Sequence, residues 1–453
     1  MIVFFNDCDV HEHGSNCVVK TKYRDGINGI EDYLQYKWCV ALIGFETGFT
    51  GFNKSKIGVN EMKKLFATLL ALTMTFSLTA CGGSAPAASS SDAGNEPAPA
   101  ASSEASPEAD SDEAAPDNAA TGGKIGVSMP TQSLQRWNQD GSNMKATLEG
   151  AGYVVDLQYA GDNDIPTQVA QIENMISSGC EVLVIAAIDG SSLTEVLKSA
   201  KDKSIPVIAY DRLLMNSDAV TYYATFDNYK VGTMQGEFIR DALKLDTEEG
   251  PFNIEMFTGS PDDNNINFFF GGAIDVLQPY IDSGKLVVKS GQTEKAQCAT
   301  LNWNTEESQK RMENLIASNN YGPDEDKTPL HAVLSSNDSV ANGITNALVA
   351  AGYTKDNFPI LTGQDCDKPA VKNMISGIQS MSIFKDTRTL ADKVVGMVDS
   401  IMKGTEVEIN DTETYNNGTG IIPSYLCDPV ICTVDNYKEL LLDSGYYTEE
   451  ELS

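Results

Sequence analysis

From Lys124 to the C-terminus, short apolar runs alternate with segments such as Ile165–Ile176 and Val371–Ile378, whose apolar residues recur every three or four positions. The runs predict buried strands, and the three-to-four spacing predicts amphipathic helices. The runs are Ile125–Met129, Val154–Tyr159, Val182–Ile188, Val207–Tyr210, Tyr222–Phe226, Phe252–Phe257, Leu286–Val288, Ala332–Leu334, Ile360–Leu361 and Met381–Phe384. Alternating strands and helices predict an α/β fold with parallel sheets covered on both faces. So many strands exceed one comfortable sheet, so residues 124–453 are expected to form two Rossmann-like lobes.

An export signal precedes this region. Met62–Lys64 supplies a basic start, Leu65–Leu78 is an apolar run too short to span a membrane comfortably, and small residues lead to Cys81. This order resembles the signal peptide and lipobox of bacterial lipoproteins. The resemblance implies that residues 62–81 are a lipoprotein signal and that Cys81 carries the lipid that anchors the protein outside the cytoplasm.

Because an export signal must leave the ribosome first, residues 1–61 are interpreted as an upstream extension from a mis-assigned start. The alternative is a genuine small N-terminal domain with 62–81 as an internal buried helix. Residues 82–123 are rich in Ala, Ser, Pro and Gly and carry eight acidic residues but no Lys or Arg. This composition has little to bury, so it predicts a disordered acidic tether.

Polar side chains follow most of the predicted strands. Ligands of open parallel sheets bind beyond the carboxyl ends of the strands, so these positions are the candidates for a binding site. They include Gln135–Trp137, Asp211–Arg212, Ser260–Asn265, Ser335–Asp338, Gly363–Asp365 and Lys385.

This set of polar side chains suits a sugar as the ligand. A hydroxyl both donates and accepts, and here carboxylates accept, Arg and Lys donate, and Asn does both. An aromatic ring can cover the apolar face of a pyranose, and Trp137 and Trp303 fall in different predicted lobes. Structural roles are the alternatives: Asp263 and Asn337 as helix N-caps, Asp211 and Arg212 as an ion pair in a loop, and Trp303 as a core residue.

The same region resembles the type I periplasmic binding proteins for monosaccharides, most closely the xylose- and galactose-type, multiple-sugar-binding branch. The matching motifs are Gln171–Met175, Ile208–Arg212, Ala224–Asn228, Ser260–Asn265, Gly363–Asp365 and Asp443–Thr448. The resemblance implies two lobes joined by a three-segment hinge, with crossings near Asp227, Asp386 and Asp411. Lobe one would be 124–227 and 387–412, and lobe two 228–386 and the C-terminal segment that follows.

It also implies the ligand contacts. The hydrogen-bonding set would be Arg136, Asp211, Arg212, Asp263, Asn265, Asn337, Asp365 and Lys385, with Trp137 and Trp303 stacking on the sugar. The ligand would be a monosaccharide of the xylose, galactose, glucose or arabinose type, bound by hinge closure and delivered to the permease and ATPase of an ABC importer. The protein would be a monomer without cofactor or metal. Presentation of the sugar to a membrane receptor is the alternative function.

Other functions fit the sequence less well. Asp263 and Asp365 are the carboxylates of a possible glycosidase, but a binding site needs carboxylates too. His331 is the only histidine after the signal and begins an apolar strand, and no GxxxxGK[ST] motif occurs. A DNA-binding regulator would carry a basic headpiece, whereas this chain has a net charge of −32 and an acidic tether, so no nucleic-acid partner is expected.

The nine cysteines show no CxxC spacing, which argues against a zinc or thioredoxin-like site. Cys427 and Cys432 are the only close pair in the folded region. They approach one another if Asp428 and Pro429 form a turn, but small buried apolar residues are the simpler interpretation. Cys298 and Cys366 sit beside binding positions with no evident need for a thiol.

Overall fold

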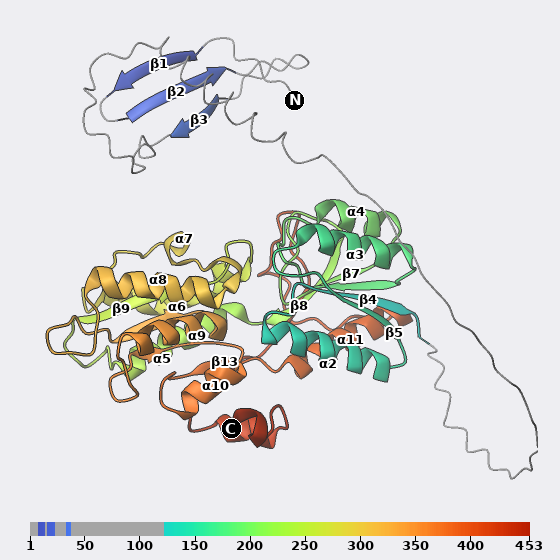
Figure 1. Ribbon diagram of the computed structural model, residues 1–453. Coiled ribbons are helices and arrows are strands. Elements are labelled where there is room, and N and C mark those ends of the chain that lie inside the picture. Colours follow the sequence, from blue (N-terminus) through green and yellow to red (C-terminus); the bar gives the residue numbers. More distant parts are fainter. Residues whose placement is uncertain (1–7, 14–15, 23–32, 38–121) are drawn as a thin grey trace, which may run out of the picture. The chain divides into compact units, whose positions relative to one another are not determined.

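The computed structural model describes residues 8–13, 16–22, 33–37 and 122–453. The expected signal peptide with Cys81 and the tether up to residue 121 lie outside the described residues. Residues 8–37 belong to a unit of their own, in which β1 (Cys8–His13), β2 (Asn16–Lys22) and β3 (Tyr33–Lys37) form an antiparallel sheet. Two lobes make up the second unit, as the sequence predicts (Figure 1).

The first lobe is built on a six-stranded parallel sheet in the order β14-β8-β7-β6-β4-β5. The strands are β4 (Lys124–Met129), β5 (Val154–Tyr159), β6 (Val182–Ile185), β7 (Val207–Tyr210), β8 (Val220–Phe226) and β14 (Ser424–Cys427). Helices α2 (Gln135–Gly150) and α11 (Thr387–Lys403) cover one face, and α3 (Ile165–Ser177) and α4 (Thr194–Asp202) cover the other (Figure 1).

The core of this lobe shows why the strand sequences are continuously apolar. Val182 and Val184 pack in the core cluster under α2 and α11, whereas the alternate residues Leu183 and Ile185 pack in the cluster under α3 and α4. Because side chains alternate across a strand, a sheet covered on both faces needs an apolar residue at every position.

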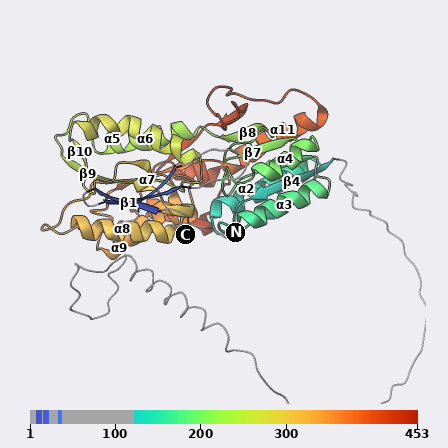
Figure 2. The ribbon, with the colours of Figure 1, turned by 90° about the horizontal axis from the view of Figure 1, so that it is seen from above.

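The second lobe has a four-stranded parallel sheet in the order β10-β9-β11-β12. The strands are β9 (Phe252–Phe257), β10 (Leu286–Val288), β11 (Ala332–Ser335) and β12 (Ile360–Leu361). Helices α5 (Asn228–Ala242) and α6 (Asn265–Asp282) lie on one face, and α8 (Thr305–Asn319) and α9 (Asp338–Ala350) on the other (Figure 2). Shorter elements are α7 (Lys295–Cys298), the 3-10 turn η1 (Leu301–Trp303) and α10 (Lys368–Ile375).

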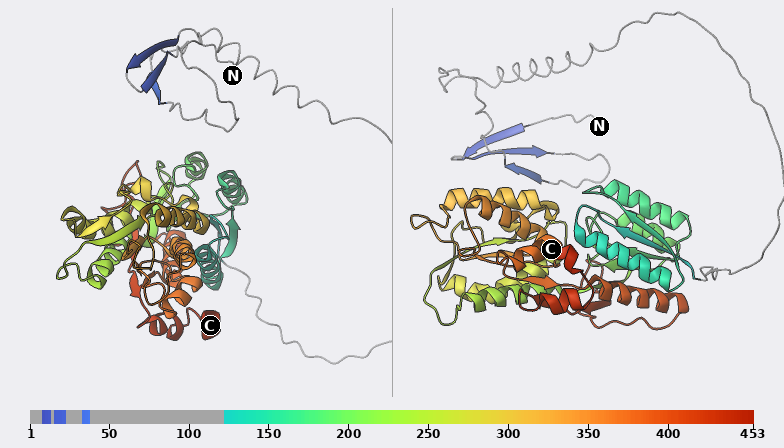
Figure 3. Two further views of the ribbon diagram at one scale, coloured as in Figure 1. Left: turned by 60° about the vertical axis from the view of Figure 1, so that its left-hand side comes forward. Right: turned by 60° about the horizontal axis from the view of Figure 1, so that its bottom comes forward.

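One predicted strand is not parallel. β13 (Ser382–Phe384) pairs antiparallel with β15 (Val430–Cys432) in a two-stranded sheet beside the second lobe. The chain then forms the π-helical turn η2 (Lys438–Asp443) and α12 (Glu449–Leu452), and this C-terminal segment, drawn in red, lies against lobe two (Figure 3).

The lobe boundaries expected from the sequence need one correction. Ser424–Cys427 pairs in parallel with β8, and Tyr415 and Ile422 lie in the core of lobe one. Residues 413–427 therefore belong to lobe one, and the third crossing lies between β14 and β15 rather than near Asp411. The other crossings follow β8 and β13, where Asp227 and Asp386 cap the next helices.

Cys427 and Cys432 lie in different sheets and are free buried thiols. Within residues 122–453 and the three N-terminal strands, no helix has the length and apolarity needed to cross a membrane.

Candidate functional site

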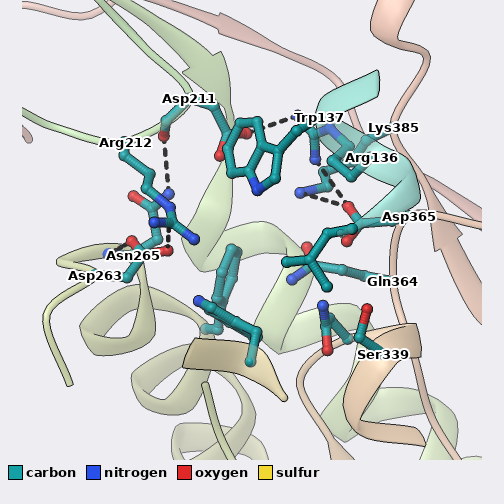
Figure 4. A pocket seen from close by; sticks show the side chains of 14 residues that line it. Arg136, Trp137, Asp211, Arg212, Asp263, Asn265, Ser339, Gln364, Asp365 and Lys385 are labelled. Atoms are coloured by element: carbon teal, nitrogen blue, oxygen red, sulfur yellow. Dashed lines mark hydrogen bonds and ion pairs between the residues drawn. The ribbon is translucent and has the colours of Figure 1, made fainter. Parts of the chain in front are cut away.

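A cavity lies between the lobes, and residues of both lobes line it (Figure 4). All ten residues expected to contact a ligand lie on its wall. From lobe one come Arg136, Trp137, Asp211 and Arg212; from lobe two come Asp263, Asn265, Trp303, Asn337, Asp365 and Lys385. The structure thus brings the predicted set together, while contact of each residue with a ligand stays a prediction.

The topology explains why these residues meet. Asp211 and Arg212 follow β7, Asp263 follows β9, and Asp365 follows β12. Arg136 lies in the first turn of α2, directly after the loop that leaves β4. The carboxyl ends of the parallel strands of both lobes therefore face the same cavity.

Arg136 is the centre of a charge network. Its Nη2 donates to Asp211 Oδ1 at 2.7 Å, its Nη1 donates to Asp365 Oδ1 at 2.8 Å, and its Nε donates to Asp140. Lys385 Nζ lies 2.9 Å from the same oxygen of Asp365. Because Asp365 belongs to lobe two, the Arg136–Asp365 pair joins the lobes.

Burial and these charges shift the pKa values of the network. Burial alone would lower the pKa of Arg136, but the three carboxylates raise it well above its ordinary value. Burial alone would raise the pKa of Asp211, but Arg136 and Lys385 lower it. Asp140 is fully buried, and burial raises its pKa to about 6 despite the opposing charge of Arg136. The network therefore holds Arg136 charged and Asp211 ionised at neutral pH.

A second charge pair crosses the lobes. Arg212 Nε lies 3.0 Å from Asp263 Oδ2, and both side chains are at least nine-tenths buried. Arg212 also donates from Nη1 to the carbonyl oxygens of Ala187 and Ile188, each at 3.0 Å. Burial raises the pKa of Asp263 although Arg212 opposes this.

The two indole rings lie on different lobes and line the same cavity. The guanidinium of Arg212 lies 5.0 Å from the ring centre of Trp137. Trp303 meets Phe269 edge-on, with ring centres 6.2 Å apart. Among the described residues, Trp303 Nε1 is buried without a hydrogen-bond partner, and so is Gln364 Oε1 on the same wall. Few buried polar atoms in proteins lack a partner, so these two stand out on residues of the cavity wall.

Several structural roles weighed from the sequence coexist with the site. Asn337 caps α9, because its Oδ1 accepts from Val340 N at 3.0 Å, and Asp263 Oδ1 accepts from Asn265 N at 2.9 Å. Trp303 belongs to the core of lobe two. Asp211 and Arg212 do not pair with each other: their partners are Arg136 and Asp263.

Three residues of the cavity wall have strained backbone conformations. Asp211, Trp303 and Asp365 have φ values of 57°, 55° and 94°, in the left-handed region that residues other than glycine rarely adopt. Such conformations persist where the surrounding structure fixes them, and they concentrate at binding sites.

Sequence reasoning missed four residues of the wall, namely Leu134, Phe269, Ser339 and Gln364. Gln364 lies within one of the polar segments that follow a predicted strand, and Ser339 comes directly after another, so the sequence could have indicated both residues. Phe269 lies one turn after Asn265 on α6, and no sequence pattern pointed to it as a wall residue. The buried carboxylate Asp140 was also missed, although it lies four residues after Arg136 on the same helix.

The two carboxylates considered for a glycosidase, Asp263 and Asp365, lie on the cavity wall, whereas His331, Cys298 and Cys366 do not. His331 Nδ1 accepts from Asn253 N at 2.8 Å and its ring meets Phe252 edge-on, away from the cavity wall. Cys298 and Cys366 are buried in core clusters and do not line the cavity.

Comparison with known proteins gives the family. Residues 125–406 match the model of the periplasmic binding protein domain. The chain is 51% identical over 340 residues to the multiple sugar-binding periplasmic receptor ChvE of Rhizobium radiobacter, an alignment that covers 75% of this chain and 94% of that protein. The chain belongs to the periplasmic binding protein family. The family resemblance noted in the sequence is thereby confirmed.

Solved structures of periplasmic binding proteins agree. An ABC transporter solute-binding protein from Clostridium phytofermentans with bound β-D-glucose is 63% identical, has a TM-score of 0.70, and is matched over 73% of this chain and 100% of its own. A carbohydrate transporter solute-binding protein from Chloroflexus aurantiacus in complex with D-glucose is 31% identical with a TM-score of 0.65, over 73% of this chain and 98% of its own.

Proposed function

We propose that this protein is an extracytoplasmic sugar-binding protein that captures a monosaccharide between its lobes and delivers it to the permease and ATPase of an ABC importer. The observation that carries the proposal is the interlobe cavity, where two indole rings from different lobes accompany charged donors and acceptors. Hydroxyl groups match such a mixed wall, and indole rings match the apolar face of a pyranose. Glucose in two similar proteins supports the same ligand class.

Hinge closure is the proposed mechanism. The Arg136–Asp365 and Arg212–Asp263 pairs join the lobes only when they are close, so a sugar that contacts both lobes stabilises the closed form. No bond is made or broken. Asp365 already pairs with two cations, which suits a fixed acceptor better than a proton donor.

The binding test is a thermal-shift panel of D-glucose, D-galactose, D-xylose and L-arabinose, followed by calorimetry. A sugar that binds the native state raises the melting temperature, and small-angle scattering should show compaction with the same sugar. Sugar recovered chemically unchanged after long incubation would agree with binding. No shift with any of these sugars, or conversion of the sugar, would contradict the proposal.

The transport role has its own test. A strain lacking this protein should take up the bound sugar more slowly. Unchanged uptake together with a lost response to the sugar would favour the sensor function instead.

We also propose that Cys81 carries a lipid anchor, that residues 82–123 tether the domain to the membrane, and that the protein acts as a monomer. Labelling with a radioactive fatty acid should mark the wild-type protein but not Cys81→Ser, and the mature chain should begin at residue 81. A labelled Cys81→Ser protein, or a mature chain that retains residues 1–61, would refute the anchor.

A further inference from the structure

The C-terminal segment makes contacts that the sugar cavity does not explain. Tyr447 lies in the motif Asp443–Thr448, which the family resemblance singled out, yet it is absent from the cavity wall. Its ring packs in a core cluster with Cys366, Val371 and Leu452, and only 3% of the residue is exposed. The packing fixes the tyrosine to lobe two.

The hydroxyl of Tyr447 connects both lobes. It donates to the carbonyl oxygen of Cys366 at 3.0 Å, within lobe two. It accepts from Gln135 Nε2 at 2.5 Å and from Gln139 Nε2 at 3.1 Å, both on α2 of lobe one. Gln135 Oε1 in turn accepts from the backbone N of Lys368 at 3.1 Å, again across the lobes.

These contacts lie one residue away from the sugar site on both sides. Gln135 precedes Arg136, and Cys366 follows Asp365, so the Arg136–Asp365 ion pair and the Tyr447 hydroxyl join the same two segments. The first turn of α2 is therefore held to lobe two from the cavity side and from the outer side.

The loop that presents Asp365 needs such support. Asp365 and Cys366 both have positive φ, 94° and 53°. Asp365 N donates to Ile383 O at 2.8 Å, and Cys366 N donates to Ser382 Oγ at 3.1 Å. The Tyr447 hydroxyl adds a third hydrogen bond to this loop, because it donates to the carbonyl oxygen of Cys366.

We propose that the C-terminal segment is a latch on the closed form, and that Tyr447 is a positioning residue which slows sugar release without touching the sugar. The proposal rests on the proposed sugar binding. Opening the lobes separates the hydroxyl from Gln135 and Gln139, whereas its bond to Cys366 stays within lobe two. The latch forms after the sugar has entered, so it acts on the release rate and not on the association rate.

The test is Tyr447→Phe, which keeps the packed ring and removes the hydroxyl. Tryptophan fluorescence in a stopped-flow instrument follows binding of D-glucose, or of whichever sugar in the panel binds more tightly, because Trp137 and Trp303 line the cavity. We expect release to accelerate about thirtyfold with an unchanged association rate, which is the effect of losing the two neutral hydrogen bonds that the hydroxyl accepts across the lobes.

The matched control is Tyr321→Phe. It removes a buried hydroxyl that donates to Glu255 Oε1 at 2.7 Å, entirely within lobe two. This variant should melt at a lower temperature but release sugar within twofold of the wild-type rate.

Gln139→Ala removes one of the two lobe-one partners of the Tyr447 hydroxyl. Release should accelerate in this variant as well, and the double variant should release sugar little faster than Tyr447→Phe alone, because both changes remove the same contact. Wild-type release from Tyr447→Phe, slower association instead of faster release, or fully additive effects would overturn the latch. A wild-type protein that binds no sugar in the panel would instead contradict the proposed function.

Discussion

Gly259 lies against the ring of Trp303 so closely that no side chain fits between them. A Cβ at this position would meet three atoms of the ring at 2.1–2.3 Å. Normal carbon–carbon contacts are about 3.5 Å, so the ring or the backbone would have to move by about 1.4 Å. The φ of Gly259 is outside the positive range, so the effect of Gly259→Ala comes from this clash and not from backbone strain.

We expect Gly259→Ala to weaken sugar binding. Trp303 lines the cavity, so a displaced ring either narrows the cavity or leaves the position from which we propose that it stacks on the sugar. An aromatic contact contributes about 0.5–1.5 kcal/mol, so losing it should raise the Kd for the sugar by about tenfold, or ~1.4 kcal/mol. The crowding should also lower the free energy of unfolding of the sugar-free protein by about 1–3 kcal/mol.

Calorimetry with the best-binding sugar measures the Kd, and thermal unfolding measures stability. Gly271→Ala is the matched control, because a Cβ at Gly271 in α6 meets nothing within 4 Å. That variant should bind sugar normally and gain about 0.5–1 kcal/mol from improved helix propensity. Equal Kd values for the two variants would refute the stacking role of Trp303.

Two further predictions concern buried charges. Arg212→Met leaves Asp263 buried without its partner, so the free energy of unfolding should fall by about 3 kcal/mol. Adding Asp263→Asn should recover part of this loss. A double variant as unstable as the sum of both single variants would contradict the pairing. Burial, aided by Asp365, raises the pKa of Asp367 to about 7. Between pH ~4 and pH ~7, Asp367 of the folded protein keeps a proton that the unfolded chain has lost. Its contribution to stability is therefore largest at low pH and is lost as the pH rises through about 7. In scanning calorimetry from pH 5 to pH 8, the wild-type melting temperature should fall relative to that of Asp367→Asn; parallel curves would exclude this titration.

The fold could be predicted because its signals are local. Val182–Ile185 is apolar at every position, which is the pattern of a strand covered on both faces, and Ile165–Ser177 has helical spacing. The ends of parallel strands could be located in the same way, so the residues that follow them could be assigned to one edge of each sheet. That two such edges would face one cavity came from the family resemblance.

The boundaries between lobes could not be predicted as well. Ser424–Cys427 has a weak strand pattern, and its place is fixed by pairing with β8, about 200 residues earlier in the sequence. The contacts of Asp140 and Tyr447 depend on partners that tertiary structure brings together, so the sequence around each residue did not reveal them. The closeness of Gly259 to Trp303 is of the same kind.

The walls of the cavity both favour and oppose closure. The Arg136–Asp365 and Arg212–Asp263 pairs cross between the lobes directly, so they favour the closed form whatever the cavity contains. Trp303 Nε1 and Gln364 Oε1 find no partner among the described protein groups, and burying such an atom unpaired costs about 1–3 kcal/mol. A hydroxyl-rich ligand can supply those partners, whereas an apolar molecule of the same size cannot. We therefore expect closure to be favourable only with a ligand of the right chemistry, and we expect selectivity for sugars to depend on the unpaired atoms as well as on the charged ones.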